Sequence, residues 1–299
     1  MLSMQRRNFL QKTFGSLIAM SALPCKETVG KEVRELRIPI LTYHRVHADD
    51  DQTMPPVKPD QYCGHVTRSD FRRQVQFLAD RGFQTITHQD LIRWFDKSAT
   101  LPPRPVLVDF DDNRLNVFQN AWPILRDRGY RATVFVITTL ADGGYIYGPH
   151  DFPAMKWKEL EELAKAGWTM GAHTRHHFRL TDMLGERQVE NYRDQAGNPQ
   201  QRSIPQGETS IMDELAGAQE DIRRHLGVKP ETFAYPVGSW NEQLEGMVKR
   251  LYRSARLWQE TGPWQYVTRI TSPYRLVGVN ISAKMTFEDF RKGAEDSGV

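Results

Sequence analysis

Three carboxylates stand at the end of an apolar segment that runs from Val106 to Asp112. In a strand Asp109 and Asp111 would share one face, and Asp112 falls where the chain must turn. Ionised carboxylates are costly to bury unless a cation or hydrogen-bond donors compensate them. The cluster is therefore either a cation-binding site or a set of caps for a helix that begins near Leu115. This segment alone does not decide between the two.

A second cluster holds three histidines within five residues, and it also follows a predicted strand. His173 and His177 are four residues apart, which brings both imidazoles to one side of a helical turn. Two histidines and one aspartate leave open positions on Zn²⁺ or a similar divalent ion, as a catalytic metal site requires. The pattern favours a metal site over structural histidines. His176 is the alternative ligand to His177.

Short apolar segments alternate with helical patterns along most of the chain, and the predicted helices end at Gly82, Gly129, Gly167 and Gly227. Continuous apolar runs suit strands that are covered on both faces, as in parallel sheets. Seven or eight such units in about 260 residues favour a single-domain α/β fold with a (β/α) barrel over two open sheets. The predicted strands are Ile38–Tyr43, Phe83–Thr87, Pro105–Phe110, Ala132–Thr138, Trp168–Ala172, Thr232–Tyr235 and Leu276–Ile281.

One stretch breaks this alternation. Gly185–Ser210 is polar, has little apolar periodicity and comes soon after the histidine cluster. A loop of this length is usually functional or disordered. We therefore predict a polar insertion over residues 185–210. In the helix that precedes Gly82, Ser69 is the expected N-cap.

The composition is that of an ordinary globular protein. The 299 residues are 39% hydrophobic and 26% charged, which excludes disordered, collagen-like and coiled-coil classes. The formal charge is +3, and residues 1–24 carry three cations and no acidic residue, so the remainder is neutral. A neutral body argues against a nucleic-acid-binding protein, which needs a persistent basic patch.

The N-terminus has the pattern of an export signal. Arg6 and Arg7 precede a modestly apolar run, Thr13–Pro24, that is too short to cross a hydrocarbon layer of about 30 Å. A cationic start, a short apolar run and small residues predict a signal peptide over residues 1–25 rather than a transmembrane span. The Arg-Arg-x-Phe-Leu sequence resembles a bacterial twin-arginine signal, so we expect export to the periplasm or cell envelope.

Two further expectations follow from this leader. Without the leader, residues 26–299 remain, and they are predicted to form one domain that includes the polar insertion over residues 185–210. A lipid anchor on Cys25 is an alternative to simple cleavage, although the proline directly before that cysteine fits a lipoprotein site poorly.

Several motifs in combination resemble the polysaccharide deacetylases of carbohydrate esterase family four, the NodB-homology group. Their order and spacing hold from Ile38 to Ser282, and the family implies a distorted (β/α) barrel with a metal at the carboxyl ends of the strands. The opening Tyr-His-Arg-Val and the insertion after the histidines resemble the branch that acts on exported poly-β-1,6-N-acetylglucosamine. The motifs are Leu41–Val46, Phe110–Asp112, His173–His177 and Phe233–Gly238.

The resemblance implies an enzyme that removes N-acetyl groups from a polysaccharide and releases acetate. Carried over by position, Asp112, His173 and His177 would bind the metal and Asp111 would be the general base. A metal-bound water has a pKa near neutrality, and an adjacent carboxylate can accept its proton. Zn²⁺ is the expected ion, and Co²⁺, Ni²⁺ and Mn²⁺ suit the same ligands.

The sequence departs from the family at three places. The glycine after the two aspartates is Asn113, a residue that tolerates a left-handed backbone. The arginine and the aromatic residue of the third motif are Ala234 and Val237. No late Leu-x-His motif supplies a general acid, and His44, at the end of the first predicted strand, is the candidate replacement.

Residues after the third motif are expected to bind substrate. A backbone N–H near Val237 would stabilise the oxyanion, and Tyr235 and Trp240 would line the groove for the polysaccharide. The alternatives are a peptidoglycan or chito-oligosaccharide deacetylase, an O-deacetylase, or a carbohydrate-binding barrel that has lost catalysis. A structural envelope protein would leave the aspartate and histidine clusters unexplained.

Overall fold

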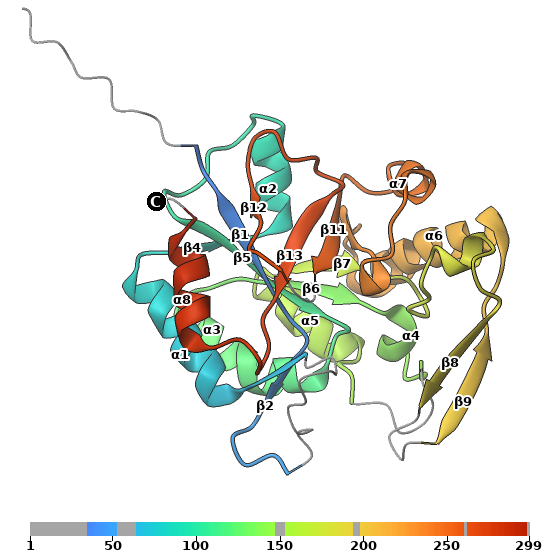
Figure 1. Ribbon diagram of the computed structural model, residues 1–299, viewed down its shortest axis with the longest axis horizontal. Coiled ribbons are helices and arrows are strands. Elements are labelled where there is room, and N and C mark those ends of the chain that lie inside the picture. The colour runs from blue at the N-terminus through green and yellow to red at the C-terminus, as the bar shows by residue number, and fades with distance from the viewer. Residues whose placement is uncertain (1–34, 53–63, 147–152, 194–197, 260–261, 298–299) are drawn as a thin grey trace, which may run out of the picture. The chain divides into compact units, whose positions relative to one another are not determined.

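Seven parallel strands close into a barrel in the computed structural model (Figure 1). The model describes residues 35–52, 64–146, 153–193, 198–259 and 262–297, so the predicted signal peptide with Cys25 lies outside the described residues. The first and last strands of the barrel (its strands are called staves below) pair with each other through Ile40 and Leu107, which closes the ring. In order around the barrel the strands are β1 (Ile38–Tyr43), β13 (Leu276–Asn280), β11 (Ser254–Gln259), β10 (Thr232–Ala234), β7 (Thr169–Ala172), β6 (Thr133–Val136) and β5 (Pro105–Asp111).

The predicted barrel is confirmed, with two differences in its strands. The predicted strand Phe83–Thr87 forms β4 (Gln84–Ile86), which lies beside β5 outside the closed ring. The stave β11 was not predicted, because its sequence carries an arginine in the middle of an otherwise apolar segment. A short strand, β12 (Tyr266–Val267), pairs antiparallel with Ile38 and Pro39 at the start of β1.

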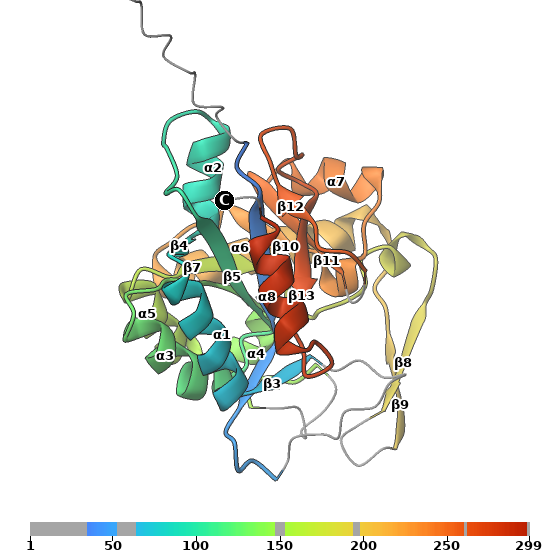
Figure 2. The same ribbon diagram turned by 60° about the vertical axis from the view of Figure 1, so that its left-hand side comes forward.

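Helices surround the strands in both views (Figures 1 and 2). Thr67, rather than the predicted Ser69, caps the first of them, because the Thr67 side chain accepts a hydrogen bond from the backbone N–H of Asp70. The longest helix starts at Gly207, within the stretch of residues 185–210 that was predicted to be a polar insertion. The helices are α1 (Arg68–Asp80), α2 (His88–Phe95), α3 (Trp122–Arg126), α4 (Thr138–Ala141), α5 (Trp157–Lys165), α6 (Gly207–Leu226), α7 (Glu242–Val248) and α8 (Phe287–Glu295).

The polar insertion contains regular structure. Strands β8 (Val189–Arg193) and β9 (Pro199–Ser203) form an antiparallel hairpin that projects from the barrel in both views (Figures 1 and 2). A second small pair, β2 (Arg45–His47) and β3 (His65–Thr67), follows β1. Among the helices of the described ranges, none is long and apolar enough to cross a membrane.

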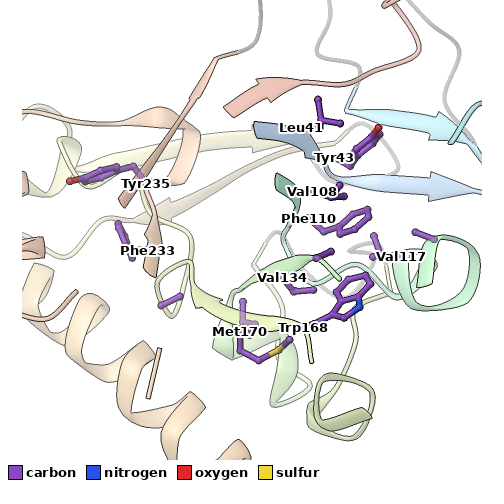
Figure 3. Close-up of a cluster of buried hydrophobic side chains, with 14 of the residues drawn as sticks. Leu41, Tyr43, Val108, Phe110, Val117, Val134, Trp168, Met170, Phe233 and Tyr235 are labelled. Atoms are coloured by element: carbon purple, nitrogen blue, oxygen red, sulfur yellow. The ribbon is translucent and has the colours of Figure 1, made fainter. Parts of the chain in front are cut away.

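The main hydrophobic core lies between the outer faces of the strands and the helices. Figure 3 shows side chains from several strands meeting there, among them Phe110, Val134 and Met170. Phe110 stacks on Trp168 with ring centres 5.6 Å apart and planes 11° apart. Alternate residues of each stave therefore face this core, which leaves the others to fill the barrel interior.

The barrel interior changes from apolar to charged along its axis. Ile40, Leu107 and Leu276 pack near the amino ends of the strands, where Leu91 and Trp94 of α2 join them. Farther along, the fully buried side chain of one arginine occupies the space between the staves, as the contacts of Arg256 with Asp109, Asp111 and Phe135 show.

One glycine makes room for this arginine, and a second makes room for the phenylalanine ring that its guanidinium contacts. A Cβ on Gly278 would lie 2.2 Å from Thr42 Oγ1 and 3.0 Å from Arg256 Cδ, and a Cβ on Gly171 would lie 2.6 Å from the Phe135 ring. Either contact would force the packing to shift. The small residues and the arginine are therefore complementary features of the same interior layer.

Candidate active site

The three predicted metal ligands meet at the carboxyl ends of β5 and β7. Asp112 follows β5, His173 follows β7, and His177 lies one turn beyond it. Asp112 Oδ1 is 3.6 Å from Nε2 of each histidine, and one ligand atom of each residue lies within 4.8 Å of the others. The structure thus brings Asp112, His173 and His177 together in the arrangement that the sequence indicated.

The chemistry of these side chains fits a divalent cation. Arg114 donates a hydrogen bond to Asp112 Oδ2 at 3.1 Å, whereas the buried Oδ1 accepts none from any described residue. His173 Nδ1 donates to the Ala234 carbonyl at 2.8 Å, which leaves Nε2, the nitrogen nearer Asp112, as the ring atom available to a metal. Burial lowers the pKa of His177 to about 3, which keeps that imidazole neutral and able to bind a metal.

The structure gives the neighbouring histidine a different partner. His176 Nδ1 lies 2.6 Å from Glu214 Oε1, and about half of its side chain is exposed. Glu214 also accepts hydrogen bonds from the backbone N–H groups of Arg175 and His176. These contacts favour His177 over His176 as the second histidine ligand.

Asp111 lies beside the three predicted metal ligands, which we call the metal-ligand cluster, with the geometry expected of a base. One of its oxygens accepts a short hydrogen bond from Arg256, and the other is 3.7 Å from His44 Nε2. Burial acts to raise the pKa of Asp111, but the positive charge of Arg256, with His44 and His173, outweighs it and leaves the pKa below its usual value. The carboxylate is therefore ionised at neutral pH.

Arg256 belongs to a buried network that the sequence analysis missed. Its Nε lies 3.2 Å from Asp109 Oδ2, and that oxygen is 2.9 Å from His88 Nε2. The third motif carries Ala234 where the family has arginine, and in this chain a guanidinium from the next strand of the barrel contacts Asp111, the predicted base. An arginine in the middle of a β-prone segment was the available signal.

We expect Arg256→Met to destabilise the protein by about 3–5 kcal/mol, because two buried carboxylates would lose their shared counterion. The free energy of unfolding in urea measures this loss. Arg253→Met is the matched control, since the exposed Arg253 pairs with Asp96 at the surface and should contribute less than about 1 kcal/mol. Equal losses in the two variants would contradict the role given to the buried network.

A cavity of about 400 Å³ opens beside these groups. Its walls include the metal-ligand cluster and Asp111. Four further residues lie in or just after other strands of the barrel: His44, Tyr235, Val237 and Trp258. Tyr235 is buried, its hydroxyl has no hydrogen-bond partner in the described ranges, and burial raises its pKa. Val237 is 42% exposed. The cavity therefore joins the predicted base, acid and metal ligands to two of the three predicted substrate residues.

The third predicted substrate residue lies elsewhere. Trp240 donates from Nε1 to Glu245 Oε2 at 3.0 Å, its ring lies 4.4 Å from the guanidinium of Arg275, and it does not line this cavity. The tryptophan that does line it is Trp258, whose ring meets His44 edge-on at 5.9 Å. Trp258 was missed together with its strand, β11.

Backbone strain is concentrated at this site. Six non-glycine residues of the described ranges have positive φ, and five of them lie in its loops. Such conformations cost about 1–3 kcal/mol each and persist where surrounding contacts over-determine them. Asn113, at φ 38°, donates to the Met155 carbonyl and accepts from the N–H of Ile137, which confirms that asparagine tolerates this turn. The other four are Asp112, Thr174, His177 and Val237.

The buried histidines predict a loss of stability in acid for the metal-free protein. Burial lowers the pKa of His44 to about 4, although Asp111 and Asp112 act to raise it. Because the unfolded histidine binds a proton near pH 6.5 and the folded one does not, stability falls as the pH drops through that value. As the pH falls from about 7.5 to about 5.5, each such histidine should lower the free energy of unfolding by about 1.4 kcal/mol.

Urea unfolding of metal-free protein at those two pH values measures this effect. His44→Gln should reduce the difference between the two free energies by the contribution of one histidine. An unchanged difference would show that His44 is protonated in the folded protein.

Comparison with known proteins places this architecture in a family. The family model for polysaccharide deacetylases matches residues 98–253, more than half of the chain. The chain belongs to the polysaccharide deacetylase family. This family member is 24% identical over 188 residues to the poly-β-1,6-N-acetyl-D-glucosamine N-deacetylase of Staphylococcus aureus, covering 62% of this chain and 58% of that protein. It spans about three-fifths of the length of the curated relatives that it matches.

Solved structures share the fold of this family member. The deacetylase PplD of Streptococcus pyogenes, in complex with acetate, superimposes with a TM-score of 0.66 at 20% identity, covering 87% of this chain and 99% of that one. IcaB of Ammonifex degensii gives a TM-score of 0.65 at 21% identity, covering 87% and 97%. These similarities support the distorted (β/α) barrel that the motifs implied.

Proposed function

We propose that this protein is a metal-dependent N-deacetylase that hydrolyses the acetamide groups of an N-acetylglucosamine polysaccharide and releases acetate. The observation that carries the proposal is the ionised, buried Asp111 beside the converging Asp112, His173 and His177. A protein that only bound sugars would gain nothing from a charged base next to the metal ligands.

The residues divide the reaction between them. A divalent ion bound by Asp112, His173 and His177, with Zn²⁺ favoured over Co²⁺, Ni²⁺ or Mn²⁺, would polarise the carbonyl and lower the pKa of a water. Asp111 accepts the proton of the attacking water as the new C–O bond forms. A backbone N–H near Val237, which borders the cavity, stabilises the oxygen of the tetrahedral intermediate.

His44 completes the reaction as the general acid. Its low pKa means that it is uncharged in the free enzyme, so it must receive the proton that it later gives away. Asp111 is the adjacent source, 3.7 Å away. As the C–N bond breaks, its electron pair stays on the nitrogen, which takes this proton, and the products are acetate and a glucosamine residue.

The substrate is proposed to be an exported poly-β-1,6-N-acetylglucosamine. The name of the Staphylococcus aureus relative and the opening Tyr-His-Arg-Val motif support this choice. The N-terminal twin-arginine pattern supports export to the periplasm or cell envelope, with residues 1–25 as the signal and 26–299 as the deacetylase domain.

Acetate release from three substrates of matched length tests the proposal. We expect the highest kcat/KM with β-1,6-linked N-acetylglucosamine oligomers and lower values with chitin oligomers and peptidoglycan fragments. A higher kcat/KM with chitin oligomers or peptidoglycan fragments would identify that polymer as the substrate instead. Binding of any of them without acetate release, with metal present, would identify a carbohydrate-binding barrel instead.

A further inference from the structure

One arginine of the β8–β9 hairpin contacts the loop that carries the second histidine ligand. Arg202 Nη1 donates to the His176 carbonyl at 2.8 Å, and Nη2 lies 3.3 Å from the His177 carbonyl. The hairpin belongs to the polar insertion, far along the chain from the aspartates, yet its guanidinium contacts two successive peptide groups of the ligand loop.

The Arg202 side chain is itself held in place on two sides. Its Nε donates to Glu190 Oε2 at 2.7 Å across the hairpin, and Nη2 lies 2.6 Å from the same oxygen. The guanidinium also lies 4.2 Å from the centre of the Phe178 ring. A guanidinium fixed by a carboxylate and an aromatic face is pre-organised, so its remaining N–H groups present a rigid fork to the loop.

The loop needs such support because its backbone is strained. Thr174 and His177 both have positive φ, at 63° and 56°. The N–H groups of the loop are held from the other side, by Glu214 of α6 and by the hydroxyl of Thr174. Arg202 is the complementary contact, since it reaches carbonyl oxygens of the same loop, those of His176 and His177.

We infer that Arg202 is a positioning residue that fixes the direction of the His177 side chain, so that the hairpin sets the metal affinity of the site. The inference rests on the proposed metal-dependent function. Contacts outside the ligand set typically change metal affinity by about 10–100-fold, and Arg202 acts at this level through the backbone of a ligand.

The test compares Arg202→Met with Arg104→Met, a matched control remote from the ligand loop. Arg104 likewise donates to a carbonyl, that of Arg81 at 2.7 Å, and lies 4.5 Å from the Phe83 ring. The Zn²⁺ dissociation constant is measured by competition with a chromophoric chelator, and the visible absorption spectrum is recorded with Co²⁺ bound. Melting of the metal-free proteins reports stability separately.

We expect Arg202→Met to raise the Zn²⁺ dissociation constant by about 10–100-fold and to change the Co²⁺ spectrum, whereas Arg104→Met leaves both unchanged. Arg202→Lys keeps the charge without the fork and should give an intermediate constant, which also covers the case in which the methionine variant does not fold. Wild-type affinity and spectrum in both Arg202 variants would overturn the inference. Failure of the native protein to bind Zn²⁺ would instead overturn the proposed function.

Discussion

Asp112→Ala is expected to abolish metal binding and acetate release together. Asp112 is the proposed carboxylate ligand, its Oδ1 lies 3.6 Å from both histidine nitrogens, and no described residue donates a hydrogen bond to that oxygen. Without it two imidazoles remain, too few ligands for a stable catalytic site. His173→Ala should have the same effect. Metal content after gel filtration and acetate release measure the two losses.

Asp182→Ala is the matched control for this variant. Asp182 is also a buried aspartate near a loop of the barrel, but its ion-pair partners are Arg179 and Arg187 rather than the histidines. It should retain one equivalent of metal and most of the activity. If Asp112→Ala kept a full equivalent of metal, the ligand assignment would be wrong.

Asp111→Asn is expected to keep the metal and lower kcat by about 10²–10⁴-fold, the usual contribution of general acid–base catalysis. Asparagine has the same shape and can still accept the hydrogen bond from Arg256, but it cannot take a proton from water. Steady-state acetate release at equal metal occupancy measures the effect.

Asp109→Asn separates base catalysis from the electrostatics of the buried network. Asp109 lies two residues before Asp111 in β5, and the substitution also removes a negative charge next to Arg256. Unlike Asp111, however, Asp109 does not line the cavity. We expect it to retain most of the turnover. Equal losses of kcat in the Asp109 and Asp111 variants would show that the charge around Arg256, rather than the Asp111 base, controls the rate.

The sequence predicts the barrel and the metal-ligand cluster well because both depend on local patterns of residues. Apolar strand segments determine the staves, and in a parallel barrel the carboxyl ends of all staves form one rim. Residues at the ends of β1, β5 and β7 can therefore be predicted to lie close together even when the packing of the barrel is unknown. This argument alone places His44, Asp111 and His173 together.

The buried network could not be predicted in the same way. Arg256 looks out of place in a strand until Gly278 is seen to leave space for its side chain, and Gly171 for the Phe135 ring that its guanidinium contacts. Those residues belong to four different strands of the barrel, so their fit is a property of the packed interior rather than of any sequence window. Trp258, two residues farther along β11, was missed for the same reason.

The choice between neighbouring side chains also depended on distant elements. His176 contacts Glu214 of α6, which favours His177 as the ligand, and Trp240 donates a hydrogen bond to Glu245 of α7. The insertion has little apolar periodicity because its hairpin is mostly exposed. The cross-strand ion pair between Glu190 and Arg202 stabilises it instead.

The most direct test of the account is acetate release as metal is returned to metal-free protein. β-1,6-linked N-acetylglucosamine oligomers serve as substrate, and Zn²⁺ is added in fractions of an equivalent. We predict that the rate rises in proportion to bound metal and saturates near one equivalent, with Asp111→Asn binding the same metal and releasing little acetate. Acetate released at full rate without metal, or none released at full occupancy, would contradict the assignment of this site as the centre of a metal-dependent deacetylase.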